Sequence, residues 1–106
     1  MRKLSILLVM TVLALGLAVG SASGGGRTVK ANNYSFKAKT VTIQKGDKVT
    51  WNDIQGRHSV TLKNGTFDKV LHKGDTVSLK FNHRGTFRYF CRFHKSLGMR
   101  GKVVVK

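Results

Sequence analysis

The sequence predicts an all-β protein: a sandwich or barrel of eight short antiparallel strands. Beyond residue 27, apolar and polar residues alternate with a period of two, which is the pattern of half-buried strands. Glycine-containing turn sequences separate the alternating runs at short intervals. No segment beyond residue 23 has a convincing helical period. Strands of this length and spacing are typical of sandwiches and barrels.

The N-terminal segment, residues 1–23, has the layout of a secretory signal peptide. Arg2 and Lys3 supply positive charge, a long apolar run follows, and small residues then offer a cleavage site. The apolar run is slightly short for a membrane-spanning helix, which needs about 20 residues. A retained membrane anchor is the alternative. We expect a flexible glycine-rich joint at residues 24–27 and a single domain at residues 28–106.

The predicted strands follow one another through this domain. Val49 and Trp51 alternate with polar neighbours, for example, and Phe87, Tyr89 and Cys91 share one face of a later strand. The expected strands are residues 28–36, 39–44, 48–53, 58–63, 66–70, 76–82, 86–91 and 101–106.

The charge of the chain is strongly positive. It has 20 Lys and Arg against 4 acidic residues, a net charge of +16, and +14 remains once Arg2 and Lys3 leave with the signal. Such an excess bears on solubility, choice of partner and rate of association rather than on fold. The acidic residues fall mostly in turn sequences, where capping of backbone amides is their expected role. They are Asp47, Asp53, Asp68 and Asp75. No pair suggests a catalytic acid, base or nucleophile, so we do not expect an enzyme.

Cys91 is the single cysteine of the chain and cannot form an internal disulfide. In a secreted protein, a lone cysteine indicates an intermolecular bridge, a reactive thiol or a metal ligand. A metal bond would protect the thiol and add free energy to folding. An inert buried cysteine is the alternative.

Two nearby residues favour a metal ligand. His94 lies three residues after Cys91 and Met99 lies five residues further on, with Gly98 giving the intervening loop freedom to turn. A thiolate, an imidazole and a thioether form a soft set of donors that suits copper.

A four-ligand site needs one more nitrogen donor. His58, which stands just before a predicted strand, is the candidate. His72 and His83 compete for the role, but both lie in ordinary turn sequences and we expect them to face solvent.

The spacing Cys-x2-His-x4-Met resembles the C-terminal signature of the plastocyanin-like blue copper proteins, the cupredoxins. An upstream Gly-Asp-x-Val-x-Trp sequence and the histidine that follows it extend the resemblance to about residues 28–106. The matching residues are Val41, Ile43, Gly46, Asp47, Val49, Trp51, Asp53, His58, Val60, Tyr89, Phe90, Cys91, His94, Met99, Gly101, Lys102, Val103 and Val105.

The resemblance implies a Greek-key β-sandwich with one type 1 copper ion that cycles between Cu(I) and Cu(II). His58, Cys91 and His94 would bind copper in a near-trigonal plane, with Met99 as the weak axial ligand. The function implied is that of a secreted one-electron carrier, in a periplasm or outside the cell. Ser59 stands where the family often has asparagine, and the chain contains no proline.

The resemblance also implies an electron port at the solvent edge of His94, within an apolar patch of Phe93, Leu97 and Gly98. Basic residues next to ligands in sequence should rim this patch: Arg57, Arg92, Lys95 and Arg100. We therefore expect redox partners with an acidic docking surface. We expect a monomer, with no stable membrane insertion of the mature chain and no specific nucleic-acid partner.

Two other functions are compatible with parts of the sequence. A copper-trafficking or copper-sequestering module of the same fold is the nearer one, although the lone cysteine favours electron transfer. A basic module that binds nucleic acid or anionic surfaces is the other. It would need exposed aromatic residues beside the basic ones, whereas most aromatics here fall on core-facing positions.

Overall fold

The computed structural model describes residues 26–106, so the predicted signal peptide lies outside the described residues. These residues form nine strands and one short 3-10 helix at Lys95–Leu97. The strands are β1 (Arg27–Asn32), β2 (Ser35–Lys37), β3 (Thr40–Ile43), β4 (Lys48–Asp53), β5 (His58–Leu62), β6 (Asp68–Leu71), β7 (Thr76–Lys80), β8 (Gly85–Phe90) and β9 (Arg100–Val105). β1 already begins at Arg27, which the sequence had suggested was part of the joint.

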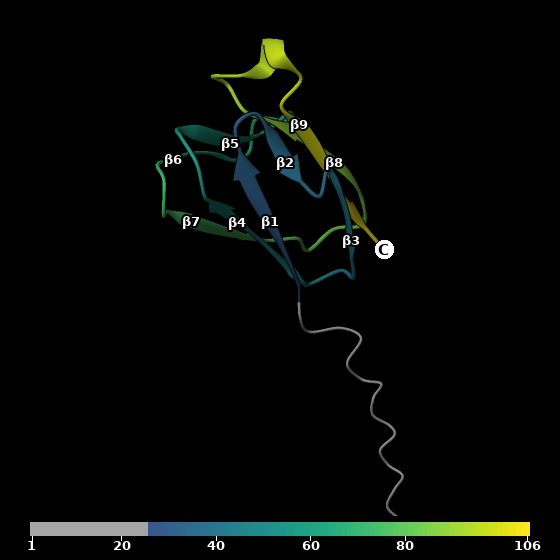
Figure 1. The fold of residues 1–106 in the computed structure, drawn as a ribbon. Helices are drawn as coiled ribbons and strands as arrows, with labels where there is room; N and C mark the ends of the chain where they lie inside the picture. Colours follow the sequence, from purple (N-terminus) through teal and green to yellow (C-terminus); the bar gives the residue numbers. More distant parts are fainter. Residues whose placement is uncertain (1–25) are drawn as a thin grey trace, which may run out of the picture.

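The strands form two sheets that pack face to face as a sandwich (Figure 1). One sheet has the order β2-β1-β4-β7 and the other the order β3-β9-β8-β5-β6. The expected all-β sandwich is therefore confirmed.

Two details of the expected architecture were wrong. The sheets are mixed and not antiparallel, because β1 pairs in parallel with β4 and β3 pairs in parallel with β9. The predicted strand at residues 28–36 is two strands, because the chain turns at Asn33 and Tyr34 and β2 pairs back on β1. Alternation reports which face of a strand is buried and carries no information on its direction.

The core lies between the sheets and contains aromatic residues that the alternating pattern had predicted to face inward. Trp51 of β4 and Tyr89 of β8 meet edge to face, with ring centroids 5.2 Å apart, and Phe36 of β2 meets Tyr89 at 4.8 Å. All three are fully buried. Burial raises the pKa of Tyr89 to about 12, so its phenol stays neutral inside the core. These contacts hold the two sheets together and fix β8, the strand that leads to Cys91.

The loop between β8 and β9 projects beyond one end of the sandwich, as Figure 1 shows. Among residues 26–106 no helix has the length and apolar content needed to cross a membrane. The projecting loop carries the residues between Cys91 and Met99.

Candidate metal centre

Cys91 and His58 meet at the end of the sandwich from which this loop projects. β5 and β8 are antiparallel, with Thr61 opposite Phe90, so the start of β5 lies beside the end of β8. The Sγ atom of Cys91 lies 3.8 Å from Nδ1 of His58, and both side chains are fully buried. Strand pairing thus joins two residues that are 33 positions apart in the sequence.

The loop after β8 brings in His94. One side-chain donor atom each from His58, Cys91 and His94 lie within 4.8 Å of one another. Backbone hydrogen bonds close the loop, because the N–H of Cys91 donates to the carbonyl of Met99 (3.0 Å) and the N–H of Met99 donates to that of His94 (3.3 Å). Met99 is fully buried. Gly98 ends the 3-10 helix at a φ of 82°, a left-handed conformation that favours glycine.

The loop between β4 and β5 orients both histidine rings. Nε2 of His58 lies 2.6 Å from the carbonyl oxygen of Gln55, and Nε2 of His94 lies 3.2 Å from that of Arg57. Because a carbonyl can only accept, each Nε2 carries the proton and donates it. In the neutral ring, Nδ1 is then the nitrogen without a proton, and it is the atom able to bind a metal.

Ser59 connects the thiol to a polar network on the adjoining surface. Its N–H donates to Sγ of Cys91 (3.4 Å), and its Oγ accepts the N–H of Arg92 (2.8 Å). The network continues from Ser59 to Thr61 (2.9 Å) and from Thr61 to Asp68 (2.6 Å). Asp68 in turn accepts two hydrogen bonds from Arg92, at 3.0 and 3.1 Å. The hydrogen bonds from Arg92 lower the pKa of Asp68.

Asp53 stabilises the loop between β4 and β5 from the interior of the protein. Its side chain is fully buried at the end of β4, and its Oδ1 accepts the N–H of Gln55 (3.0 Å). Gln55 is the residue whose carbonyl holds His58. Burial raises the pKa of Asp53, because the low-dielectric surroundings disfavour the charged form. Asp53 therefore caps a backbone amide, as expected, but in the interior and not in an exposed turn.

His94 is the candidate ligand nearest to solvent, since it is only half-buried. Its ring meets Tyr34 edge to face at 4.6 Å and Phe93 at 6.5 Å. A shallow hollow adjoins it, lined by Asn33, Tyr34, Gly56, Arg57, Phe93 and His94. Leu97, at the tip of the loop, is 61% exposed. The apolar patch around His94 thus also contains Tyr34. The sequence had predicted Tyr34 to lie within the strand at residues 28–36.

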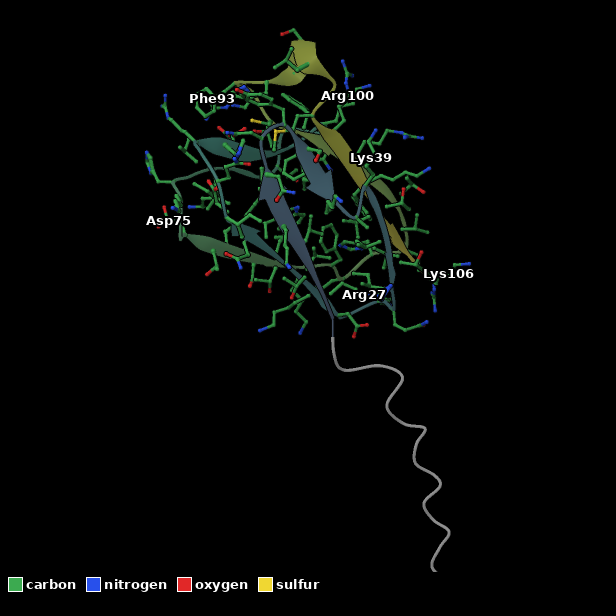
Figure 2. All side chains as sticks on the ribbon, in the orientation of Figure 1. Arg27, Lys39, Asp75, Phe93, Arg100 and Lys106 are labelled. Carbon is green, nitrogen blue, oxygen red and sulfur yellow. The ribbon has the colours of Figure 1, made fainter. Side chains whose placement is uncertain are left out.

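The basic residues near the ligands divide into two groups. The guanidinium of Arg57 lies 4.1 Å from the centroid of the Phe93 ring, and that of Arg92 lies 5.3 Å from it. Lys95 and Arg100 instead line a separate pocket on β8 and β9. In Figure 2, Phe93 and Arg100 lie on opposite sides of the projecting loop. Only two of the four expected cations therefore lie beside Phe93.

His72 and His83 are exposed, as expected, and Nδ1 of His72 lies 3.6 Å from Oδ2 of Asp75. The sequence did not reveal the parts played by Gln55 and Tyr34. Gln55 acts through its backbone, which no residue type reports, and Tyr34 reaches His94 through a turn hidden within an alternating run.

The donor set fits copper. A buried cysteine sulfur and two imidazole nitrogens in a small cluster, with a thioether buried nearby, are the donors of blue copper sites. Structural zinc sites, in contrast, are usually closed by four cysteine and histidine ligands. The hydrogen bonds that both Nε2 atoms donate to backbone carbonyls add the outer support that metal-binding histidines require.

This fold and this donor set define a cupredoxin. A family model for copper binding proteins, the plastocyanin/azurin family, matches residues 25–106, and the chain belongs to that family. Amicyanin-alpha from Methylorubrum extorquens is 35% identical over 96 residues, which cover 84% of this chain and 79% of that protein. The chloroplastic plastocyanin of Tetradesmus obliquus is 33% identical over 84 residues, which cover 67% of this chain and 58% of that one.

Solved structures agree. A purple cupredoxin from Nitrosopumilus maritimus superposes with a TM-score of 0.67 at 22% identity, over 76% of this chain and 99% of that chain. A reduced amicyanin variant superposes with a TM-score of 0.68 at 30% identity, over 76% and 82% of the two chains.

Proposed function

We propose that His58, Cys91, His94 and Met99 hold one type 1 copper ion and that the protein is a one-electron carrier. One observation carries the proposal. The lone thiol of the chain is fully buried between two histidines whose orientation is already fixed by hydrogen bonds. The curated relatives named above, amicyanin and plastocyanin, support this function.

Bound copper would supply the change between Cu(I) and Cu(II). The chain supplies a framework that need not move when the charge changes. His58 and Cys91 extend directly from paired strands, and the loop of His94 is closed by its own backbone hydrogen bonds. The N–H of Ser59 points at the Cys91 sulfur, and such a bond stabilises electron density on the thiolate and raises the reduction potential.

His94 is the proposed electron port. His58, Cys91 and Met99 are fully buried, whereas the ring of His94 is partly exposed between Tyr34 and Phe93. A partner seated on Phe93 and Leu97 would therefore come closer to this ligand than to the other three.

The proposed partner is a redox protein with an acidic docking surface. Arg57 and Arg92 lie over Phe93 beside the port. Because Arg92 is also paired with Asp68, Arg57 contributes most of the positive charge there. Opposite charges on two partners speed their encounter, and salt screens that attraction. We further propose that the protein acts as a monomer in the periplasm or outside the cell, after removal of residues 1–23.

Reconstitution with Cu(II) tests the site. We expect one copper ion per chain and the intense visible absorption of a copper–thiolate bond. Cys91→Ser should abolish that absorption, whereas the matched control His83→Gln, which alters an exposed histidine, should retain it. Absorption that survives in Cys91→Ser would refute the ligand assignment.

A reduction cycle separates the carrier from a copper-trafficking module. A carrier keeps its ion through reduction and reoxidation, so the absorption should return in full after each cycle in the presence of a Cu(I) chelator. Progressive transfer of copper to the chelator would instead support trafficking.

A further inference from the structure

A second polar site lies on the outer face of the five-stranded sheet, and none of the proposed copper ligands lines it. This pocket, here called the basic pocket, has a volume of about 190 Å³. Its lining contains four cationic side chains, two from arginine and two from lysine, and no acidic residue. The lining residues are Lys63, Arg88, Tyr89, Phe90, Lys95, Arg100 and Gly101.

Strand pairing brings Arg88 and Arg100 together, and the adjoining loops add Lys63 and Lys95. Arg88 and Phe90 are two residues apart on β8 and therefore project from the same face. Arg100 of β9 is directly opposite Phe90, and the N–H of Lys63 donates to the carbonyl of Arg88 at 2.8 Å. The ammonium of Lys95 lies 4.6 Å from the centroid of the Phe90 ring. An aromatic wall with positive charge around it concentrates the electric field in the pocket.

No acidic side chain lines the pocket, and each aspartate makes a hydrogen bond to a residue outside that lining. Asp53 is buried and bonded to Gln55, and Asp68 is paired with Arg92. Asp75 accepts the N–H of His72, and Asp47 accepts that of Gln44. Glutamate is absent from the sequence.

The clustering of cations on this face also creates electrostatic repulsion. Arg88 lies directly opposite Lys102 in the register of β8 and β9. Like charges in directly opposed positions destabilise a sheet. An anion in the pocket would relieve this repulsion.

We propose that the basic pocket binds a phosphate-class oxyanion. Two guanidinium groups can grip such a group with paired hydrogen bonds, and two ammonium groups can balance its multiple negative charge. A single carboxylate would neutralise only one of the four cations. The pocket is smaller than the roughly 300 Å³ of sites for drug-sized ligands, so it suits a single phosphate or a diphosphate.

The basic pocket is distinct from the proposed electron port. None of its lining residues is shared with the hollow beside His94. Arg100, which belongs to the pocket, lies across the projecting loop from Phe93 in Figure 2. The inference therefore does not depend on the electron-carrier function.

Titration of the Cu(I)-loaded protein with inorganic phosphate and pyrophosphate, followed by amide NMR at low ionic strength, tests the proposal. We expect saturable shifts confined to Lys63, Arg88, Phe90, Lys95 and Arg100, with chloride at equal ionic strength producing none. Arg88→Gln/Arg100→Gln should weaken binding at least about tenfold, because it removes two charge-assisted sets of hydrogen bonds.

A matched control removes the same charge elsewhere. Lys48 and Lys80 are opposed on β4 and β7 of the other sheet, so Lys48→Gln/Lys80→Gln also deletes two facing cations. This variant should bind phosphate within about twofold of the unaltered protein. Shifts spread over all basic residues without saturation, or an equal loss in the control, would overturn the proposal.

Two further arms identify the source of the anion. If the protein also binds phosphatidylglycerol vesicles, and Arg88→Gln/Arg100→Gln abolishes this, the phosphate of a lipid headgroup is a ligand. Binding to phosphate without binding to vesicles indicates a free anion. If a glutamate-rich peptide shifts the pocket amides and phosphate and pyrophosphate do not, the pocket is a docking site for an acidic protein and the proposal is wrong.

Discussion

The backbone N–H of Ser59 donates to the Sγ of Cys91 over 3.4 Å. The same residue accepts the N–H of Arg92 on its Oγ, so β5 holds both the thiol and the residue after it. The family resemblance implies asparagine, which has a longer side chain, at the position of Ser59. The shorter side chain still reaches the loop, and it adds a link through Thr61 to Asp68. The connection between the two ligand-bearing segments is thus kept with a different residue.

Replacement of Ser59 by alanine should weaken this connection. The N–H of Arg92 would lose its acceptor, and we expect the free energy of unfolding to fall by about 1 kcal/mol. Chemical unfolding of the copper-free protein measures the change. Ser78→Ala is the matched control, because the Ser78 hydroxyl bonds only to that of Thr50 at an exposed position. A loss no larger than in the control would show that Ser59 does not hold the loop.

Much of the fold was predictable because alternation reports burial directly. Val49, Trp51, Tyr89 and Cys91 are all buried, as their positions in alternating runs indicated. The directions of the strands were not predictable, since the parallel pairing of β1 with β4 depends on how separate segments meet in space.

The candidate site, too, was predictable only in part from the sequence. The spacing of Cys91, His94 and Met99 is local, so the sequence could propose it, and the structure brings Cys91, His94 and the distant His58 together. The side to which Lys95 and Arg100 project depends on the loop path and on the register of β9, neither of which leaves a mark in residue type.

Removal of the Asp68 charge should produce a stability loss that depends on pH. Hydrogen bonds from Arg92 lower the pKa of Asp68 below its ordinary 3.8, so the folded state favours the ionised form. The resulting stability is present above that ordinary value and is lost as the pH falls through the lowered folded pKa. Asp68→Asn should therefore cost about 0.5 kcal/mol at neutral pH, since the pair is exposed, and nothing once the carboxyl is protonated in both states. Urea unfolding of Asp68→Asn and of the unaltered protein, at neutral and at strongly acidic pH, measures this loss of stability. A loss of the same size at both pH values would contradict the prediction.

Asp53 should show the opposite sign. Burial raises its pKa above 3.8, so the folded state holds the proton more tightly than the unfolded state. This carboxyl therefore lowers stability as the pH rises through the raised folded pKa. The unfolding free energy of Asp53→Asn, relative to that of the unaltered copper-free protein, should rise between about pH 3 and pH 7. Any constant cost of the amide cancels in this comparison. A difference that falls over the same interval would show that burial does not control this group.

Arg57→Gln should slow association with an acidic redox partner. Arg57 lies over Phe93 beside the proposed port, and its charge is therefore placed to attract an opposing carboxylate during encounter. We expect the association rate at low ionic strength to fall roughly threefold and its dependence on salt to become shallower.

The carbonyl that accepts from His94 belongs to the backbone and is unaffected by the substitution. Lys48→Gln removes the same charge at the start of β4, the opposite end of the strand from Asp53 and the ligand loops. Stopped-flow measurement of electron transfer compares the two variants, and equal slowing would show that only net charge, and not the cation beside Phe93, guides the partner.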